Sequence, residues 1–124
     1  MLEAIVLAVA AVVFLGFAIL GLFRPRMILE PLGGHVETPS VANEIRANYG
    51  GMQLGIAVLL ALGAARPGLR VHALALLFTF TAGLCLGRLV SRFADGSPNR
   101  FVRMFFALEA AGALVSGALL LRGT

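Results

Sequence analysis

The chain has 124 residues, of which 60% are hydrophobic and only 13% are charged. A soluble domain of this length exposes more surface than so few charged side chains can cover, so this composition excludes an ordinary soluble globular protein. The one cysteine, Cys85, excludes both an internal disulfide and a metal site built from several cysteines.

The positive charge of the chain is distributed unevenly. All ten basic residues are arginines, and the formal net charge is +4. The arginines stand singly at the ends of apolar runs, which is typical of membrane topology and not of a nucleic-acid-binding surface. We therefore expect membrane lipids as partners and no nucleic acid.

The first apolar run covers residues 4–23 and contains no charge and no proline. An α-helix of this length spans about 30 Å, which is the thickness of the hydrocarbon core of a bilayer. A signal peptide would need a positive N-terminal region and a small-residue cleavage site, whereas the early side-chain charge here is Glu3 and the run ends at Arg-Pro-Arg. We expect a retained membrane span.

Residues 27–40 are rich in proline and glycine, which predicts a loop or a short interfacial segment. Thr38 or Ser40 can cap the helix that follows, because Pro39 is tolerated in a first helical turn. This second helix is expected to cross the membrane over residues 45–65 and to end at the Arg-Pro-Gly sequence that follows it.

Two further spans are predicted, a third over residues 71–90 and a fourth over residues 101–121, separated by an Asp-Gly-Ser-Pro turn signal. The sequence therefore predicts a single transmembrane domain, residues 1–124, of the all-α class. Its architecture is expected to be an integral membrane four-helix bundle.

An even number of spans places both termini on the same side of the membrane. The ends of the spans around the first and third loops carry more arginines than the opposite side. These arginines are Arg24, Arg26, Arg46, Arg92, Arg100 and Arg103. The positive-inside rule then predicts that the first and third loops are cytoplasmic and that both termini lie outside.

Polar residues of the last three spans converge at one end of the predicted bundle. The second helix begins where the third ends and the fourth begins, so their side chains share one half of the bilayer. A charge inside the membrane is costly and normally faces the bundle interior, where it finds a partner. We expect a ligand-binding site there, formed by Arg46, Tyr49, Gln53, Arg88 and Glu109. No catalytic residue, metal site or cofactor is assigned.

Two interpretations of Arg88 and Glu109 are open at this point. Either they neutralise each other and fix the register of two helices, or they belong to a site for a ligand, a proton or an ion. Small residues predict where helices approach each other closely. We expect such contacts at Gly51 and Gly55 of the second helix and at Gly112 of the fourth.

Two sequence blocks resemble a family of small bacterial membrane proteins. The first reads Asn-Glu-x-Arg-Ala-x-Tyr-Gly-Gly over residues 43–51, and the second reads Gly-Arg-x-x-Ser-x-x-x-Asp-Gly-x-Pro over residues 87–98. The helical Glu109 fits the same pattern, and the similarity covers nearly the whole chain. The family is known as domain of unknown function number 4345 and is distantly similar to DoxX-like proteins. The resemblance implies a four-helix bundle in the bacterial inner membrane, with no established activity or cofactor.

Three kinds of function are open. A membrane-embedded pocket that binds or moves a small amphipathic or anionic molecule is favoured, because guanidinium groups bind carboxylates and phosphates in bidentate fashion. The alternative is a non-catalytic accessory subunit of a larger membrane complex, since small-residue helix faces suit packing against other chains. A homo-oligomer that holds a bound lipid or metabolite would favour the pocket. An enzyme is the weakest interpretation, because the chain contains no G-x-S-x-G, H-E-x-x-H or glycine-rich phosphate loop.

Overall fold

The computed structural model describes residues 1–123, and every regular element in that range is helical. Four helices are long and apolar enough to cross a membrane. They are α1 (Leu2–Phe23), the second span (Pro39–Ala65), α5 (Arg70–Ala94) and α6 (Arg100–Arg122). The expected fold class, an all-α integral membrane four-helix bundle, is confirmed.

The second span is one continuous helix built from three segments. α3 (Pro39–Ile45) and α4 (Met52–Ala65) are α-helical, and the residues between them, Arg46–Gly51, form a π-helix. Thr38 caps the start of the span, because its side-chain oxygen accepts a hydrogen bond from the Val41 amide at 3.2 Å.

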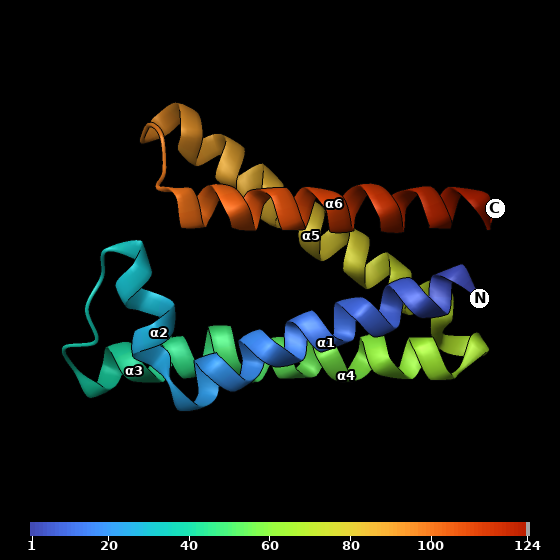
Figure 1. Ribbon diagram of the computed structural model, residues 1–124, viewed down its shortest axis with the longest axis horizontal. Coiled ribbons are helices and arrows are strands. Elements are labelled where there is room, and N and C mark those ends of the chain that lie inside the picture. Colours follow the sequence, from blue (N-terminus) through green and yellow to red (C-terminus); the bar gives the residue numbers. More distant parts are fainter. Residues whose placement is uncertain (124) are drawn as a thin grey trace.

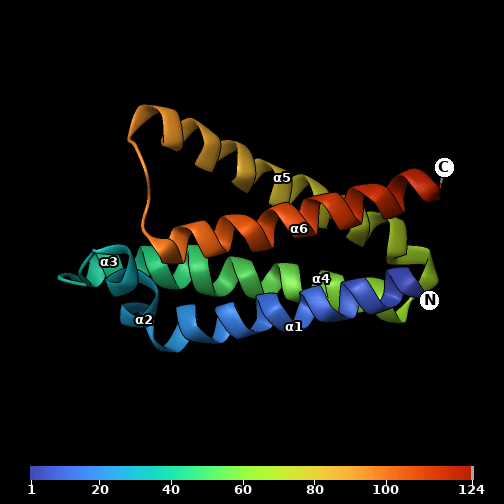
Figure 2. The same ribbon diagram turned by 45° about the horizontal axis from the view of Figure 1, so that its top comes forward.

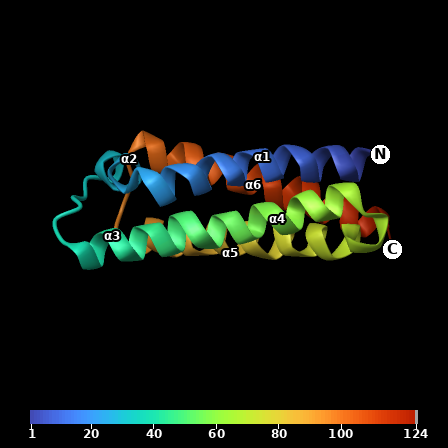
Figure 3. The same cartoon turned by 90° about the horizontal axis from the view of Figure 1, so that it is seen from below.

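The helices form two antiparallel pairs. α1 runs beside the second span and α5 runs beside α6, so that both chain ends lie at one end of the molecule (Figure 1). α1 and α4 stay side by side when the molecule is seen from below (Figure 3). A single 3-10 turn, Pro67–Leu69, joins α4 to α5. The first and third connections therefore lie at the end of the molecule opposite the termini.

The first connection contains α2 (Pro25–Leu29) and a 3-10 turn over Glu30–Leu32 that ends at Gly33 with a φ of 90°. Proline fits a first helical turn because its missing N–H is not needed there, and glycine adopts the left-handed conformation without steric cost. This connection touches the third one, where Asn99 Nδ2 donates a hydrogen bond to the carbonyl of Pro31 at 2.9 Å. The two connections therefore lie next to each other at the end of the molecule opposite the termini (Figure 2).

A small apolar core lies between the four long helices in the half of the molecule that holds the termini. Leu7 of α1 and Leu60 of α4 are completely buried, and Ala73 and Leu77 of α5 and Leu119 of α6 pack with them. These contacts join the two helix pairs at this end. The opposite half, with the first and third connections, contributes little to the core.

Many large apolar side chains outside this core face outward. Val12, Leu114 and Leu121 are 69%, 75% and 77% exposed. In water each such side chain would forgo about 1.5–3 kcal/mol of burial, whereas acyl chains of a bilayer cover it without cost. The exposed surface is therefore that of helices surrounded by lipid.

Glycines set the closest approach between α1 and the π-helical segment. A Cβ added to Gly50 would lie 2.8 Å from the backbone nitrogen of Leu22, and a Cβ added to Gly21 would overlap the carbonyl of Tyr49. Both positions therefore require glycine, because backbones in direct contact leave no room for a side chain.

The expectation that Gly51 and Gly55 form the packing face of the second helix is wrong. A Cβ at Gly51 meets only the Arg46 carbonyl oxygen at 3.9 Å, and a Cβ at Gly55 meets nothing within 4 Å. The physical reason is the π-helix, which accommodates an extra residue in one turn and shifts the register of the positions around it. Gly50, and not Gly51, therefore makes the close contact with α1.

Candidate functional site

The π-helical segment contains most of the first sequence block and orients its polar side chains. Asn48 Nδ2 donates hydrogen bonds to the carboxylate of Glu44 at 3.1 Å and to the carbonyl of Glu44 at 3.0 Å. These bonds connect α3 to the π-helical turn. π-Helical turns inside α-helices occur frequently at functional sites, because they point side chains in directions that a regular helix cannot provide.

Arg46 binds the end of α1. Its Nη1 donates a hydrogen bond to the carbonyl of Leu22, which lies in the last turn of α1. Carbonyl groups in a last turn lack intrahelical partners, and a positive charge there is also favoured by the helix dipole. Arg46 therefore fastens α1 to the second span, close to the glycine contact between Gly21 and Gly50.

Arg88 of α5 and Glu109 of α6 form a direct bidentate ion pair. Nε of Arg88 donates to Oε2 of Glu109 at 2.5 Å, and Nη2 donates to Oε1 at 2.6 Å. The two side chains are 28% and 14% exposed, and the ring centroid of Phe105 lies 6.0 Å from the guanidinium carbon. Two parallel bonds fix the plane of the guanidinium. They leave its Nη1 amino group without an acceptor among residues 1–123.

This ion pair lies where α5 and α6 begin to separate. Toward the termini the helices are in close contact, because a Cβ on Gly112 would lie 3.2 Å from Thr81 and a Cβ on Gly117 would lie 3.0 Å from Phe78. The contact expected at Gly112 is confirmed. Toward residues 95–99 the two helices diverge, and an extended loop joins them (Figures 1 and 2).

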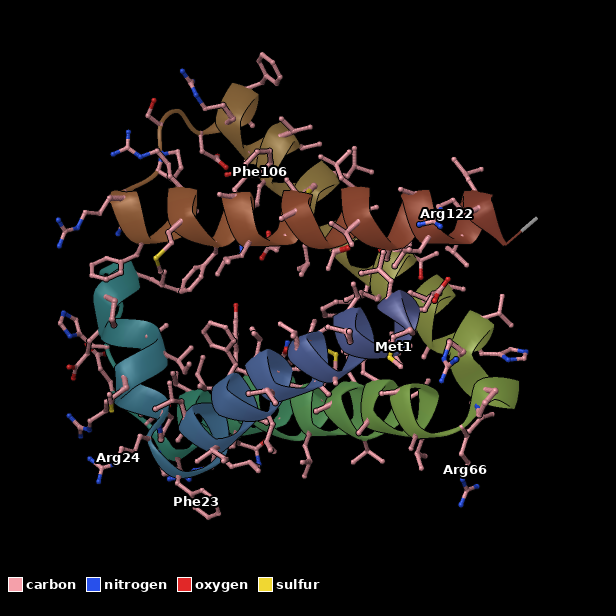
Figure 4. The ribbon with its side chains drawn as sticks, turned by 45° about the vertical axis from the view of Figure 1, so that its right-hand side comes forward. Met1, Phe23, Arg24, Arg66, Phe106 and Arg122 are labelled. Atoms are coloured by element: carbon pink, nitrogen blue, oxygen red, sulfur yellow. The ribbon has the colours of Figure 1, made fainter. Side chains whose placement is uncertain are left out.

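A cavity of about 1080 Å³ lies along the diverging part of α5 and α6. α5 supplies most of its wall from successive helical turns between Thr79 and Arg92. The first turns of α6 supply Val102 and Phe106, and Phe106 projects from α6 toward α5 (Figure 4). Tyr49 of the π-helical segment also lines the cavity and is 43% exposed. The cavity is therefore built from three of the four spans.

The charged residues of the cavity wall are all basic. Arg88, Arg92 and Arg103 line it, and no aspartate or glutamate is among its described lining residues. Two carboxylates stand next to the wall without lining it. Glu109 is bound to Arg88, and Asp95 accepts a hydrogen bond from Ser91 Oγ at 2.8 Å. The electrostatic character of the cavity is thus set by guanidinium groups.

Of the five residues expected at a ligand site, Tyr49 and Arg88 line this cavity. Glu109 is bound to Arg88 but does not itself line the cavity. Arg46 is turned toward α1 and does not line it. Gln53 is half-buried, and its side chain forms no hydrogen bond within the described part of the chain. The structure thus brings three of these residues together and leaves two apart.

Two arginines of the cavity, Arg92 and Arg103, were expected at this end of the bundle but were not included among the site residues. Neither side chain forms an ion pair or hydrogen bond with another residue in the range 1–123. Helical spacing places Arg92 on the same face as Arg88, because it follows Arg88 by four residues. The antiparallel order of the third and fourth spans places Arg103, near the start of the fourth span, close to the end of the third.

Within residues 1–123, no three His, Cys, Asp or Glu side chains are grouped closely enough to hold a metal ion. The arrangement instead suits an anion, because it consists of guanidinium donors, one phenol and an otherwise largely apolar wall.

Four apolar spans, three of which line a cavity that contains arginines, define a small polytopic α-helical membrane protein. The chain matches the family described as Domain of unknown function (DUF4345) over residues 2–120, and it belongs to that family. The membership expected from the two sequence blocks is thereby confirmed. No curated protein and no solved structure matches the chain.

Proposed function

We propose that this protein binds a small amphipathic anion in the membrane, in the cavity between α5 and α6. The observation that supports this function is the composition of the cavity wall, which holds Arg88, Arg92 and Arg103 and no carboxylate among its described residues. A positive charge inside a membrane is costly unless a partner of opposite charge neutralises it. An anionic group in the cavity supplies that partner.

Each polar group has a definite part in this proposal. Arg92 and Arg103 bind the anionic headgroup, because their guanidinium groups have no other acceptor among the described residues. Arg88 offers its Nη1 amino group, while its bonds to Glu109 hold the guanidinium plane in place. The Tyr49 hydroxyl adds a neutral donor. A carboxylate or a phosphate matches this set, since both accept bidentate bonds from guanidinium.

The apolar part of the ligand lies against the remaining wall. Phe80, Leu84 and Phe106 line the same cavity as the arginines. A purely inorganic anion would leave this apolar surface without a partner, and a purely apolar ligand would leave the arginines unpaired. A molecule with one anionic end and one apolar end satisfies both.

We also propose which end of the protein faces the cytoplasm. The arginine-rich end of the bundle is placed in the cytoplasm of a bacterial inner membrane, so that the cavity opens toward the cytoplasmic leaflet. The contact between the first and third connections, through Asn99 and Pro31, supports a common side for both. Both termini then lie outside.

Binding can be measured by native mass spectrometry of the protein in a non-ionic detergent. Dodecyl phosphate should bind, and dodecylphosphocholine, which has the same tail and a neutral headgroup overall, should bind much more weakly. Arg103→Gln and Arg92→Gln should each lower the affinity for dodecyl phosphate about tenfold or more, because one charge-assisted hydrogen bond contributes about 1.5–3 kcal/mol.

Arg122→Gln serves as the matched control, because Arg122 ends α6 at the opposite end of the molecule (Figure 4). It removes the same charge from the same helix and should leave the affinity unchanged. Equal binding of the two amphiphiles, or equal losses in Arg103→Gln and Arg122→Gln, would contradict the proposed site.

A second candidate, an accessory subunit of a larger membrane complex, is favoured by the far end of α5. Leu86, Val90 and Phe93 form one face there and are 64%, 60% and 88% exposed. This face continues past the predicted third span toward the membrane surface, where lipid covers it less completely. Purification in a mild detergent distinguishes the two functions. A large partner in stoichiometric amount supports the subunit, and the chain alone with a bound amphiphile supports the pocket.

A further inference from the structure

The charged and apolar parts of the cavity are separated along α5. Arg88 and Arg92 line the part near the third connection, whereas Thr79 and Phe80 line the part nearest the middle of the helix. The hydroxyl of Thr79 is already bonded to the carbonyl of Ala75 at 2.8 Å, so this inner part offers no free hydroxyl. From Thr79 to Arg92 the helix rises about 20 Å. The inner end therefore suits hydrocarbon only.

Two glycines interrupt the α5 wall between these ends. Gly83 and Gly87 both line the cavity, and a Cβ added to either would meet no atom within 4 Å. They differ from Gly112 of α6, where an added Cβ would lie 3.2 Å from Thr81. Gly112 is needed for helix packing. Gly83 and Gly87 are not, and their missing side chains instead enlarge the cavity.

We propose that Gly83 determines the length of the apolar tail that the cavity accepts. The ligand places its anionic headgroup at Arg88, Arg92 and Arg103 and extends a single hydrocarbon tail along Gly83 toward Phe80. This inference rests on the proposed function and adds to it the class of ligand, a single-tailed amphiphile with a phosphate or carboxylate headgroup. Gly83 lies between the two ends, so a side chain there blocks the tail and leaves the headgroup site open.

The test compares octyl, dodecyl and hexadecyl phosphate as ligands of the parent protein and of Gly83→Leu, by native mass spectrometry in a non-ionic detergent. The leucine side chain should lower the affinity for hexadecyl phosphate on the order of tenfold, because a tail that fills the cavity would be overpacked. Octyl phosphate should bind Gly83→Leu as it binds the parent. The chain-length preference thus shifts toward short tails.

Gly55→Leu is the matched control. Gly55 also lies in the middle of a membrane-spanning helix, an added Cβ there also meets nothing within 4 Å, and it does not line this cavity. Both variants therefore share the gain in helix propensity and the added apolar surface. Gly55→Leu should keep the chain-length profile of the parent.

The outcomes separate this inference from the function on which it rests. If the parent binds none of the alkyl phosphates, the proposed function fails and the tail site fails with it. If the parent binds them but Gly83→Leu and Gly55→Leu give the same profile, only the role of Gly83 is overturned. Inorganic phosphate should not displace dodecyl phosphate at the same concentration. If it did, the headgroup alone would account for binding, and the proposed tail site would be overturned.

Gly83→Ala provides a second test of the inference if the Gly83→Leu variant does not fold. Alanine is the most favourable helix residue and adds one methyl group to the open wall. It should shift the chain-length profile in the same direction by a smaller amount. A profile identical to that of the parent would overturn the inference on its own.

Discussion

The ion pair between Arg88 and Glu109 makes a prediction about stability that can be worked out from its geometry. Arg88→Gln leaves the Glu109 carboxylate, which is 14% exposed, without either of its two short hydrogen bonds. Glu109→Gln leaves a 28% exposed guanidinium in the same position. Each single variant therefore strands one charge in a poorly solvated place between α5 and α6.

The magnitude follows from the degree of burial. Removing one partner of a fully buried ion pair costs about 3–5 kcal/mol. The two side chains retain some exposure, so we expect each single variant to lose about 2–4 kcal/mol. The double variant has two neutral amides that can bond to each other, and it should lose only about 1 kcal/mol. The coupling free energy is then on the order of 3 kcal/mol or more, at the upper end of measured values.

The assay is reversible unfolding in mixed micelles, followed by far-ultraviolet circular dichroism, for the parent, the two single variants and the double variant. The pair Arg26–Glu30 provides the control, because its atoms are 3.9 Å apart and its side chains are 70% and 52% exposed. Its coupling should not exceed about 0.5 kcal/mol. Additive losses at Arg88 and Glu109, equal to the sum of the single variants, would refute the reasoning from burial.

Three further predictions concern packing, capping and topology. Gly50→Leu should prevent folding or lower the unfolding midpoint strongly, whereas Gly51→Leu should be tolerated, as measured by thermal unfolding in detergent; equal effects would contradict the glycine contact. Asn99→Ala should cost about 1–2 kcal/mol, because Asn99 caps α6 through the Val102 amide, and Asn99→Asp should cost less because it keeps that cap. In a cysteine-free background, cysteines at Ser97 and Gly123 should be labelled from opposite sides of the membrane, and labelling of both from one side would refute the four-span topology.

The four spans could be predicted because lipid imposes a strict rule on the backbone. Every N–H and C=O group inside a bilayer must be bonded within the chain, so a long apolar run without proline has the helix as its solution. Residues 4–23 satisfy this rule alone, and α1 (Leu2–Phe23) forms there. The Arg-Pro-Gly sequence after residue 65 likewise marks a real end, because α4 stops at Ala65 and Pro67 begins the turn to α5.

The packing of the second span could not be predicted in the same way. A sequence pattern read at 3.6 residues per turn assigns Gly51 and Gly55 to one face, but that face depends on uniform α-helical geometry. The π-helix at Arg46–Gly51 ends at the first residue of this pair and changes the direction in which their shared face points. It is stabilised by tertiary contacts, in which Arg46 reaches the Leu22 carbonyl and Gly50 meets the backbone of α1. Spacing within one helix contains no information about these contacts.

The cavity depends on the sizes of residues along α6, which is a property of two helices together. Gly112 and Gly117 let α5 approach closely in the half of α6 near the C-terminus, whereas Phe105 and Phe106 occupy the other half. Phe105 packs edge-on against Phe17 of α1 at a centroid distance of 5.7 Å. The close contacts between α5 and α6 thus lie in the half of α6 that holds Gly112 and Gly117, and the helices diverge where these small residues end.

The same change in residue size explains why the charges are arranged as they are. Glu109 stands close to the point of divergence and is within reach of Arg88, so that pair is satisfied inside the protein. Arg92 and Arg103 lie beyond that point, where α5 and α6 have separated and no described carboxylate lines the wall. Long arginine side chains at the edge of a bilayer can reach water and lipid headgroups, so these two guanidinium groups do not require a carboxylate within the chain. The close contact of small residues in one half of the pair thus leaves the other half with the cavity and with two arginines that no carboxylate of residues 1–123 binds.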